Sequence, residues 1–195
     1  MRPFIKRFFD LVMAFIGIVL LFPFLLVIIL IHVFRMPDGS IFFIQKRVGR
    51  NGRLFKMIKF RTMLINHTGS SVSVKGESRI TSFGAFLRKY KIDELPELVN
   101  VLIGDMSMVG PRPDVPGYAD KLVGEHRLIL KLRPGITGPA SIVYANEEEL
   151  LASVTNPQKY NDEVIYPDKV RINLEYYHNN SFFGDLRIIF RTFFR

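Results

Sequence analysis

The sequence predicts an α+β, mainly helical protein with an N-terminal membrane segment, a small β-hairpin and interfacial amphipathic helices. Three observations lead to this fold class: an uncharged apolar run over residues 11–34, an Asn-Gly turn between two strand-like segments, and a basic, phenylalanine-rich pattern over residues 182–195. A chain of 195 residues is long enough for one domain with its own core plus a membrane element. We therefore expect a membrane segment over residues 1–35 and one further domain over residues 36–195.

The apolar run admits two topologies. As a helix it reaches about 36 Å, which is enough to cross a bilayer. Pro23 lies near its middle, where it removes a backbone donor and disfavours a straight helix. The flanks are basic on both sides, with Arg2, Lys6 and Arg7 before the run and Arg35, Lys46 and Arg47 after it. Basic flanks tend to stay cytoplasmic, so two topologies have to be considered. One is a plain spanning helix, and the other is a re-entrant helix-break-helix that turns back at Pro23.

A β-hairpin is expected directly after the membrane segment. Residues 41–48 and 54–63 have strand character, and Asn51-Gly52 between them is a strong turn signal. Residues 66–76, which are rich in serine, threonine and glycine, are expected to form a loop.

The rest of the chain is expected to be mostly helical. Three helices are predicted, over residues 82–91, 94–103 and 118–132, and a further helix is expected to begin at Glu147. Gly104 suits the end of the second helix. Residues 133–139 form a Pro- and Gly-rich loop whose Arg133 favours contact with a ligand. Residues 182–195 place phenylalanines on one helical face and arginines on another, as in helices that lie in a membrane interface.

The chain is strongly basic and contains no cysteine. The formal net charge of +9 suits nucleic acid, anionic lipid or a phosphorylated substrate as a partner. The absence of cysteine excludes a disulfide scaffold and a thiolate zinc site.

Residues 88–113 hold the strongest candidate site. Asp93 and Glu94 are adjacent carboxylates, Arg88 precedes them, and Arg112 follows between two prolines, Pro111 and Pro113. An acidic pair with fixed cations nearby suits a divalent metal together with a phosphate. The plainer alternative is that Asp93 only caps the following helix.

The surrounding motifs resemble those of the bacterial sugar transferase family, the monotopic phosphoglycosyl transferases. The resemblance runs over nearly the whole chain. It includes Lys59-Phe60-Arg61-Thr62-Met63, Asp93-Glu94-Leu95-Pro96, Gly110-Pro111-Arg112-Pro113, Arg133-Pro134-Gly135 and Asn179-Asn180-Ser181. Each motif alone is weak, and their order and spacing together make the resemblance specific. It favours the re-entrant form of the N-terminal segment.

The resemblance also implies a reaction. In this family the first acid of the pair, here Asp93, attacks the β-phosphate of a UDP-sugar and carries the phosphosugar covalently, while UMP leaves. A polyprenyl phosphate such as undecaprenyl phosphate then accepts the phosphosugar. The resemblance implies Mg²⁺ as cofactor, bound at Asp93 and Glu94, and it leaves open whether Glu94 binds the metal or moves a proton.

Further residues enter as candidates for binding the substrate phosphates and nucleotide: Lys59, Arg61, Arg88, Pro111, Arg112, Pro113 and Arg133. The implied location is the bacterial inner membrane, with residues 36–195 as a catalytic domain on the cytoplasmic face. Anionic lipid is an expected partner and nucleic acid is not. The sequence does not decide whether the protein forms a homodimer.

Two other readings compete with this one. A basic membrane adaptor that recruits nucleic acid or an acidic protein would explain the charge, but not the acidic pair beside the Pro-Arg-Pro turn. A transferase that passes the bare sugar would release UDP rather than UMP.

The chain departs from the family pattern at two places. Asn173 stands where the family often has an acid, and Gly138-Pro139-Ala140-Ser141-Ile142 differs from the commoner Gly-Leu-Ala-Gln form. Both differences bear on which sugar is accepted, and neither touches the acidic pair.

Overall fold

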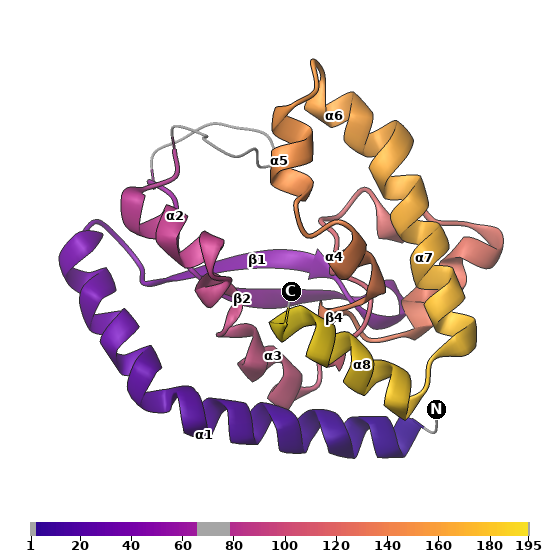
Figure 1. The fold of residues 1–195 in the computed structure, drawn as a ribbon, viewed down its shortest axis with the longest axis horizontal. Helices are drawn as coiled ribbons and strands as arrows, with labels where there is room; N and C mark the ends of the chain where they lie inside the picture. The colour runs from indigo at the N-terminus through magenta and orange to yellow at the C-terminus, as the bar shows by residue number, and fades with distance from the viewer. Residues whose placement is uncertain (1–2, 66–78, 195) are drawn as a thin grey trace.

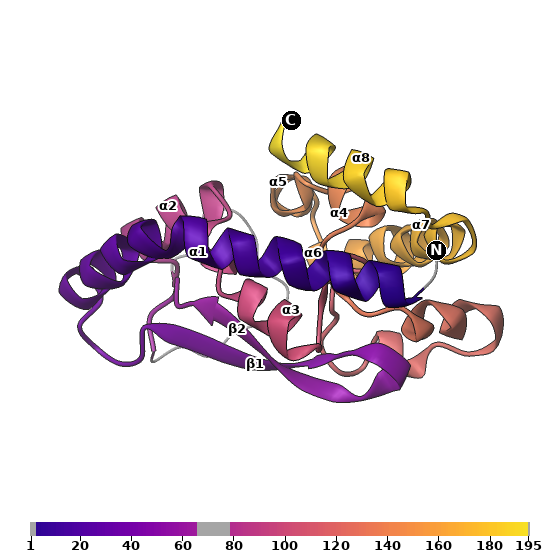
Figure 2. The same cartoon turned by 90° about the horizontal axis from the view of Figure 1, so that it is seen from below.

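The computed structural model describes residues 3–65 and 79–194, and the expected loop over residues 66–76 lies outside these ranges. A long N-terminal helix, α1 (Pro3–Arg35), runs along one side of the molecule beneath α3 (Glu97–Ile103) and α8 (Phe182–Phe193) (Figure 1). In the turned view α1 passes between the hairpin strands and α8 (Figure 2). The N-terminal helix therefore packs along one side of the fold, where it contacts α3 and the segment Ser107–Val109.

Helix α1 is long and apolar enough to cross a membrane, with a mean hydropathy of 3.2 over its most apolar stretch. It is continuous through Pro23, and Figure 1 shows that it bends along its length. A proline inside a helix removes one hydrogen bond and favours a bend, but the remaining bonds hold the helix together. The expectation of two helices separated by a break at Pro23 is therefore wrong, because the structure has one bent helix.

The N-terminal half of α1 is attached to the rest of the protein by polar side chains. Arg7 donates to the carbonyl oxygens of Val101 and Leu102, at 2.7 and 3.0 Å, near the C-terminal end of α3. Asp10 is buried and accepts from the Ser107 hydroxyl and the Met108 amide, both at 3.0 Å. Between these contacts and Pro23, the apolar side of α1 joins a hydrophobic core, whose buried members are Ala14, Met57, Leu98, Val101 and Met106.

A second set of contacts holds the C-terminal helix against α1. Lys6 Nζ lies 2.5 Å from a carboxylate oxygen of Asp185 on α8, and the Tyr176 hydroxyl donates to the other oxygen at 2.6 Å. Asp185 is fully buried. Its charge is therefore balanced by Lys6 and hydrogen-bonded by Tyr176, which comes from α7 (Tyr166–Asn179).

The hairpin is confirmed. Strands β1 (Phe42–Val48) and β2 (Leu54–Phe60) pair antiparallel, with Phe42 opposite Phe60 and Val48 opposite Leu54. Asn51 and Gly52 both have positive φ, as the turn signal predicts. The return strand ends at Phe60, three residues before the expected end, and Met63 makes only an isolated bridge to Ile80.

Helix α2 (Ser82–Lys89) begins with Thr81 as its N-cap, and Gly84 N donates to the Thr81 hydroxyl at 2.9 Å. Helix α3 starts at Glu97 rather than at the expected Glu94, because a separate 3₁₀ turn covers Ile92–Glu94. Gly104 ends α3 with a φ of 102°, as expected.

The Pro-Arg-Pro segment is positioned by two short strands, which the sequence did not predict. Strand β3 (Ser107–Val109) pairs in parallel with β4 (Gly135–Thr137). A Cβ on Gly135 would lie 2.1 Å from the Gly110 nitrogen, so only glycine permits this close approach. The loop expected over residues 133–139 thus contains a strand that fixes Gly110 just before Pro111.

The prediction of a helix over residues 118–132 is wrong. This region forms two 3₁₀ segments, Ala119–Lys121 and Gly124–Lys131, separated by extended residues. Gly124 has a φ of 57°, which interrupts a continuous helix.

The C-terminal half is helical. Its elements are α4 (Pro139–Val143), α5 (Glu147–Ala152), α6 (Pro157–Tyr160), a π-helical turn (Asn161–Ile165), α7 and α8. Helix α5 begins at Glu147 as predicted. Helix α8 confirms the amphipathic helix predicted at the C-terminus, and Phe183, Phe190 and Phe193 on it are exposed.

Candidate active site

Asp93 and Glu94 lie in the 3₁₀ turn that precedes α3, and both are buried. Lys91 enters this turn with a φ of 56°, a left-handed conformation that is uncommon for a lysine. The N-cap of α3 is Pro96, and no side chain caps the helix. The plain capping role considered for Asp93 is therefore excluded, and burial of two adjacent carboxylates needs another explanation.

Two cations converge on Glu94. Lys59 Nζ from β2 donates to Glu94 Oε1 at 2.8 Å, and Arg112 Nη2 donates to the same oxygen at 2.5 Å. Burial alone would raise the pKa of Glu94, but Arg112 and Lys59 together hold it well below its usual range. Glu94 is thus a carboxylate at neutral pH.

A third acid, Glu97, joins the cluster. Lys59 Nζ lies 3.1 Å from Glu97 Oε1, so one ammonium group serves two buried carboxylates. Burial raises the pKa of Glu97 to about 7, with Lys59 opposing the shift and Glu94 adding to it. Glu97 is not among the predicted site residues, although it follows Glu94 by only three residues; the 3₁₀ turn before α3 brings both acids to Lys59.

Asp93 has an unused oxygen. Its Oδ1 is buried and has no hydrogen-bond partner, unlike Glu94 beside it. Burial raises the pKa of Asp93, the neighbouring Glu94 raises it further, and Lys59, Arg88 and Lys91 lower it. A buried oxygen without a partner is uncommon, and it marks a position where a ligand or ion completes the site.

The donor set fits a hard divalent cation. Asp93 Oδ1 is unpartnered, and the adjacent residue Glu94 has a second carboxylate oxygen besides the Oε1 that Lys59 and Arg112 occupy; carboxylate oxygens are the ligands that Mg²⁺ prefers. Within residues 3–65 and 79–194, no three histidine, cysteine or acidic side chains gather to hold a metal ion. Mg²⁺ held here would take its other ligands from substrate phosphate and water, as is usual for this ion.

Arg88 on α2 is close enough to Asp93 to lower the pKa of its carboxyl group. It forms an ion pair with Glu148 of α5, and its Nε is buried without a partner. That N–H can therefore be donated to an anion.

Three of the expected binding residues make contacts with groups other than Glu94. Arg61 donates to the carbonyl oxygens of Ser40 and Met36, both at 2.7 Å, and so holds the segment that leaves α1. Arg133 donates to the Gly104 carbonyl at 2.9 Å, and the Pro113 carbonyl accepts from Arg47 at 3.0 Å. Within the described residues no contact joins Arg61 or Arg133 to the Glu94 cluster, whereas the structure does bring Lys59, Pro111 and Arg112 there. Pro113 directly follows Arg112, and burial lowers the pKa of the Arg47 that it binds, while Arg112 lowers it further and Glu94 raises it.

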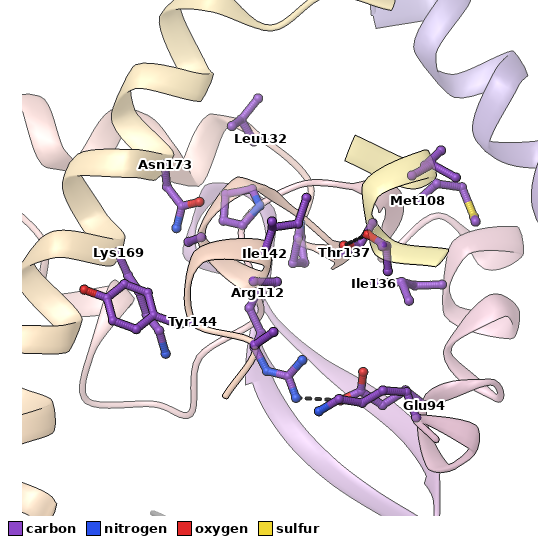
Figure 3. Close-up of a pocket in the computed structure, with 18 of the residues that line it drawn as sticks. Glu94, Met108, Arg112, Leu132, Ile136, Thr137, Ile142, Tyr144, Lys169 and Asn173 are labelled. Atoms are coloured by element: carbon purple, nitrogen blue, oxygen red, sulfur yellow. Dashed lines mark hydrogen bonds and ion pairs between the residues drawn. The ribbon is translucent and has the colours of Figure 1, made fainter. Parts of the chain in front are cut away.

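A cavity of about 790 Å³ opens beside this cluster. Figure 3 shows the Arg112–Glu94 pair on one side of it, with Tyr144, Lys169 and Asn173 along one wall and Met108, Ile136 and Thr137 along the opposite wall. The apolar wall continues onto α1 and α8 through Met13, Ile16, Leu20, Ile189 and Phe193. The cavity thus has a charged floor, one polar wall and one apolar wall.

The polar wall contains groups that the sequence analysis did not assign. Lys169 Nζ lies 2.6 Å from Glu147, and it also lies 5.6 Å from the centre of the Tyr144 ring. Asp114, which lines the same region, has its pKa raised to about 6 by burial. No local sequence signal points to these residues, because three separate segments supply them.

A volume of this size lies within the range of small-molecule sites. Two basic side chains, Lys59 and Arg112, are held by an acid that stays ionised, so their charges are fixed in space. Such preorganised cations stabilise phosphate oxygens without reorganising. The arrangement suits chemistry on a phosphate that carries a large, partly apolar neighbour.

Comparison with known protein families agrees with the chemistry that the site suggests. The family model for the bacterial sugar transferases matches residues 1–195, the whole chain.

The matches to three relatives cover nearly all of this chain. The exopolysaccharide production protein ExoY of Rhizobium meliloti is 33% identical, and the match spans 96% of this chain and 83% of ExoY. The galactosyl transferase CpsE of Streptococcus agalactiae is 36% identical over 96% of this chain and 41% of CpsE. The UDP-galactose-lipid carrier transferase of Erwinia amylovora is 34% identical over 97% of this chain and 39% of that protein.

The chain thus spans most of ExoY and about two fifths of the other two relatives. Since the family model matches the whole chain, and ExoY is a relative of similar length, the family is established. The chain belongs to the bacterial sugar transferase family and is an enzyme of that family.

Proposed function

We propose that the protein transfers a sugar 1-phosphate from a UDP-sugar to undecaprenyl phosphate, releasing UMP and giving undecaprenyl-diphosphate-sugar. The names of two relatives support this choice of substrates: a UDP-galactose-lipid carrier transferase and an Aeromonas hydrophila N-acetylgalactosaminephosphotransferase that acts on undecaprenyl phosphate. The observation that carries the proposal is the buried, unpartnered Asp93 Oδ1 beside the Glu94–Arg112 and Glu94–Lys59 pairs.

The proposed reaction has two steps. A carboxylate oxygen of Asp93 attacks the β-phosphorus of the UDP-sugar, and the bond from that phosphorus to the bridging oxygen breaks. UMP leaves with the electron pair, and the phosphosugar stays on Asp93. An oxygen of undecaprenyl phosphate then attacks the same phosphorus, and the Asp93 carboxylate is released. Dividing one difficult transfer into two displacements is the general advantage of covalent catalysis.

Each charged residue has a role in this scheme. Arg112 and Lys59 face the phosphate oxygens that gain charge in the transition state, and Glu94 holds both cations in place. The free Nε of Arg88 donates to a phosphate oxygen. Asp93 and Glu94 are the residues that would hold Mg²⁺, which would add positive charge at the diphosphate.

The apolar wall of the cavity suits the lipid acceptor. Met13, Ile16 and Leu20 of α1 and Ile189 and Phe193 of α8 line it. We propose that α1 places this wall in the bacterial inner membrane, with the catalytic groups on the cytoplasmic face. The product would serve as the lipid-linked start of a glycan such as a capsule, exopolysaccharide or O-antigen.

The test is nucleotide release by the full-length protein in nanodiscs, with Mg²⁺, undecaprenyl phosphate and a panel of UDP-sugars. UMP that appears with one donor, and depends on the lipid for turnover, supports the proposal. Release of UDP would show transfer of the bare sugar instead. Salt-sensitive nucleic-acid binding with no nucleotide release would favour the adaptor reading.

The covalent step has a separate test. Mixing the protein with a UDP-sugar and no lipid should give one equivalent of UMP and a mass increase equal to one phosphosugar. The Asp93→Asn variant should show neither. A mass increase that persists in this variant would assign the attack to another residue.

A further inference from the structure

Unpartnered polar atoms gather on one wall of the cavity. Four of the buried side-chain oxygen atoms that lack a hydrogen-bond partner belong to Asp93, Ser141, Tyr166 and Asn173. Asp93 belongs to the catalytic cluster. The other three residues all line the cavity, and none of them takes part in the reaction described above. Since buried polar atoms are nearly always paired, three such atoms in one wall indicate a missing ligand.

The three residues come from two packed helices. Tyr166 and Asn173 are seven residues apart on α7, and the cavity-lining residues Lys169 and Val170 lie between them, so one face of α7 follows the cavity. Ser141 lies on α4, which packs against α7. Asn173 is itself only 7% exposed, and Figure 3 shows it beside the cavity on the same side as Lys169 and Tyr144.

The side chains of these three residues are polar and uncharged. The Asn173 Oδ1 can only accept a hydrogen bond, whereas the hydroxyl groups of Ser141 and Tyr166 can donate or accept. Sugar hydroxyl groups and an acetamido N–H match these groups. A phosphate would instead use the cations of the catalytic cluster, Arg112 at the cavity and Lys59 behind it on Glu94.

We propose that Ser141, Tyr166 and Asn173 form the subsite that recognises the hydroxyl or acylamino groups of the donor sugar. The inference rests on the proposed function, since the sugar is placed there by a diphosphate bound at Arg112. It assigns sugar selection to the polar wall of α4 and α7. A neutral hexose or N-acetylhexosamine is the class of sugar that this wall accepts.

Ordered water is the competing explanation, because a polar cavity can hydrate its own lining. The two explanations differ in what substitution does. A residue that contacts the sugar changes the preference among donors, whereas a residue that only holds water changes every donor alike.

The experiment measures kcat and KM for UMP release with UDP-galactose, UDP-glucose, UDP-N-acetylgalactosamine and UDP-N-acetylglucosamine. It uses full-length protein in nanodiscs with Mg²⁺ and undecaprenyl phosphate. Asn173→Ala, Ser141→Ala and Tyr166→Phe are compared with the parent protein. Loss of one neutral hydrogen bond is expected to lower kcat/KM for the best donor about 5- to 10-fold and to reduce its preference over its epimer.

Inhibition by UMP separates the sugar from the nucleotide. The inhibition constant for UMP should stay within about twofold in all three variants, because UMP lacks the donor hexose and so has no group to place in the subsite. The matched control is Asn146→Ala, an exposed asparagine that does not line the cavity, and its donor preference should equal that of the parent. Thermal unfolding midpoints identify any variant that fails to fold.

The outcomes are distinct. A changed donor ratio with constant UMP inhibition supports the subsite. An equal loss for all four donors, or an unchanged kcat/KM in the folded Asn173→Ala and Tyr166→Phe proteins, would overturn it while leaving the transferase assignment intact. No UMP from the parent with any donor would overturn the proposed function, and the subsite with it.

Discussion

Arg112 Nη2 donates to Glu94 Oε1 across 2.5 Å, and this pair joins the Pro-Arg-Pro segment to the turn before α3. The contact does two things at once. It keeps Glu94 ionised, and it holds the guanidinium group at the edge of the cavity, where a substrate phosphate is proposed to bind. Removing either partner leaves the other charge without its main counterion.

Replacing Arg112 with lysine should lower kcat/KM for UMP release by about 10²-fold. Lysine keeps the charge but loses the planar fork that can hold Glu94 and a phosphate oxygen together. Steady-state kinetics on the nanodisc protein measure the effect. Arg171→Lys, at an exposed arginine paired within its own helix, is the control and should retain full activity. An active Arg112→Lys enzyme would show that positive charge alone is sufficient.

Asp93→Asn should reduce turnover by at least about 10³-fold, because the amide cannot act as a nucleophile. The fold should not lose stability, since the substitution removes a buried charge that Glu94 repels. Nucleotide release and thermal unfolding measure the two effects. The exposed Asp38→Asn serves as the matched control for both. A lower unfolding midpoint together with inactivity would indicate a structural role for Asp93 instead.

Glu97 should make stability depend on pH between about 4.5 and 7. Burial raises its pKa to about 7, so the folded protein binds more protons than the unfolded chain in this window. The stability contribution is therefore present at the acidic end and is lost as the pH rises through 7. Asp114, with a pKa of about 6, acts in the same direction.

Chemical unfolding with EDTA present, at several pH values, tests this effect. In Glu97→Gln the free energy of unfolding should depend less on pH, and its change across the window should be smaller by an amount on the order of 1 to 3 kcal/mol. The exposed Glu175→Gln should leave the slope as it is in the parent protein. A parent protein whose stability rises from pH 4.5 to 7 would contradict the prediction.

Asp185→Ala should destabilise the protein by about 3 to 5 kcal/mol, because it leaves the partly buried Lys6 ammonium without its counterion. Tyr176→Phe removes only one hydrogen bond to Asp185 and should cost about 1 kcal/mol. Denaturant titrations give both values. Glu163→Ala, at an exposed acid, should change stability by less than about 0.5 kcal/mol. Equal costs for Asp185 and Glu163 would show that the Lys6 pair contributes little.

Elements with a local signal were the ones that the sequence predicted well. Asn51-Gly52 marks the hairpin turn, and Gly104 marks the end of α3, since each residue adopts a backbone conformation that its type favours. Gly124 offers the same kind of signal inside the helix expected over residues 118–132, and its positive φ prevents that helix.

The parallel pairing of β3 with β4 could not be predicted, because each strand is only three residues long and the partners lie far apart in the chain. For the same reason the cluster around Lys59 was predicted only in part. Asp93, Glu94 and Arg112 share one motif region, but Glu97 becomes a member only when β2 brings Lys59 against α3. Arg61 and Arg133 lie in motifs too, and their carbonyl contacts show that a motif arginine can support the backbone.

Helix α1 is two-sided, and this limits how the enzyme can be handled. One side buries Ala14 against Leu98 and Val101, whereas Phe15, Val19 and Phe22 are exposed on the remainder. A truncated protein that begins after Arg35 would uncover Leu98, Met106 and the carbonyl oxygens that Arg7 satisfies. Helix α1 therefore cannot be removed without opening the core of the rest of the chain, so a preparation of the active enzyme has to keep α1 together with the apolar side chains exposed on its other side.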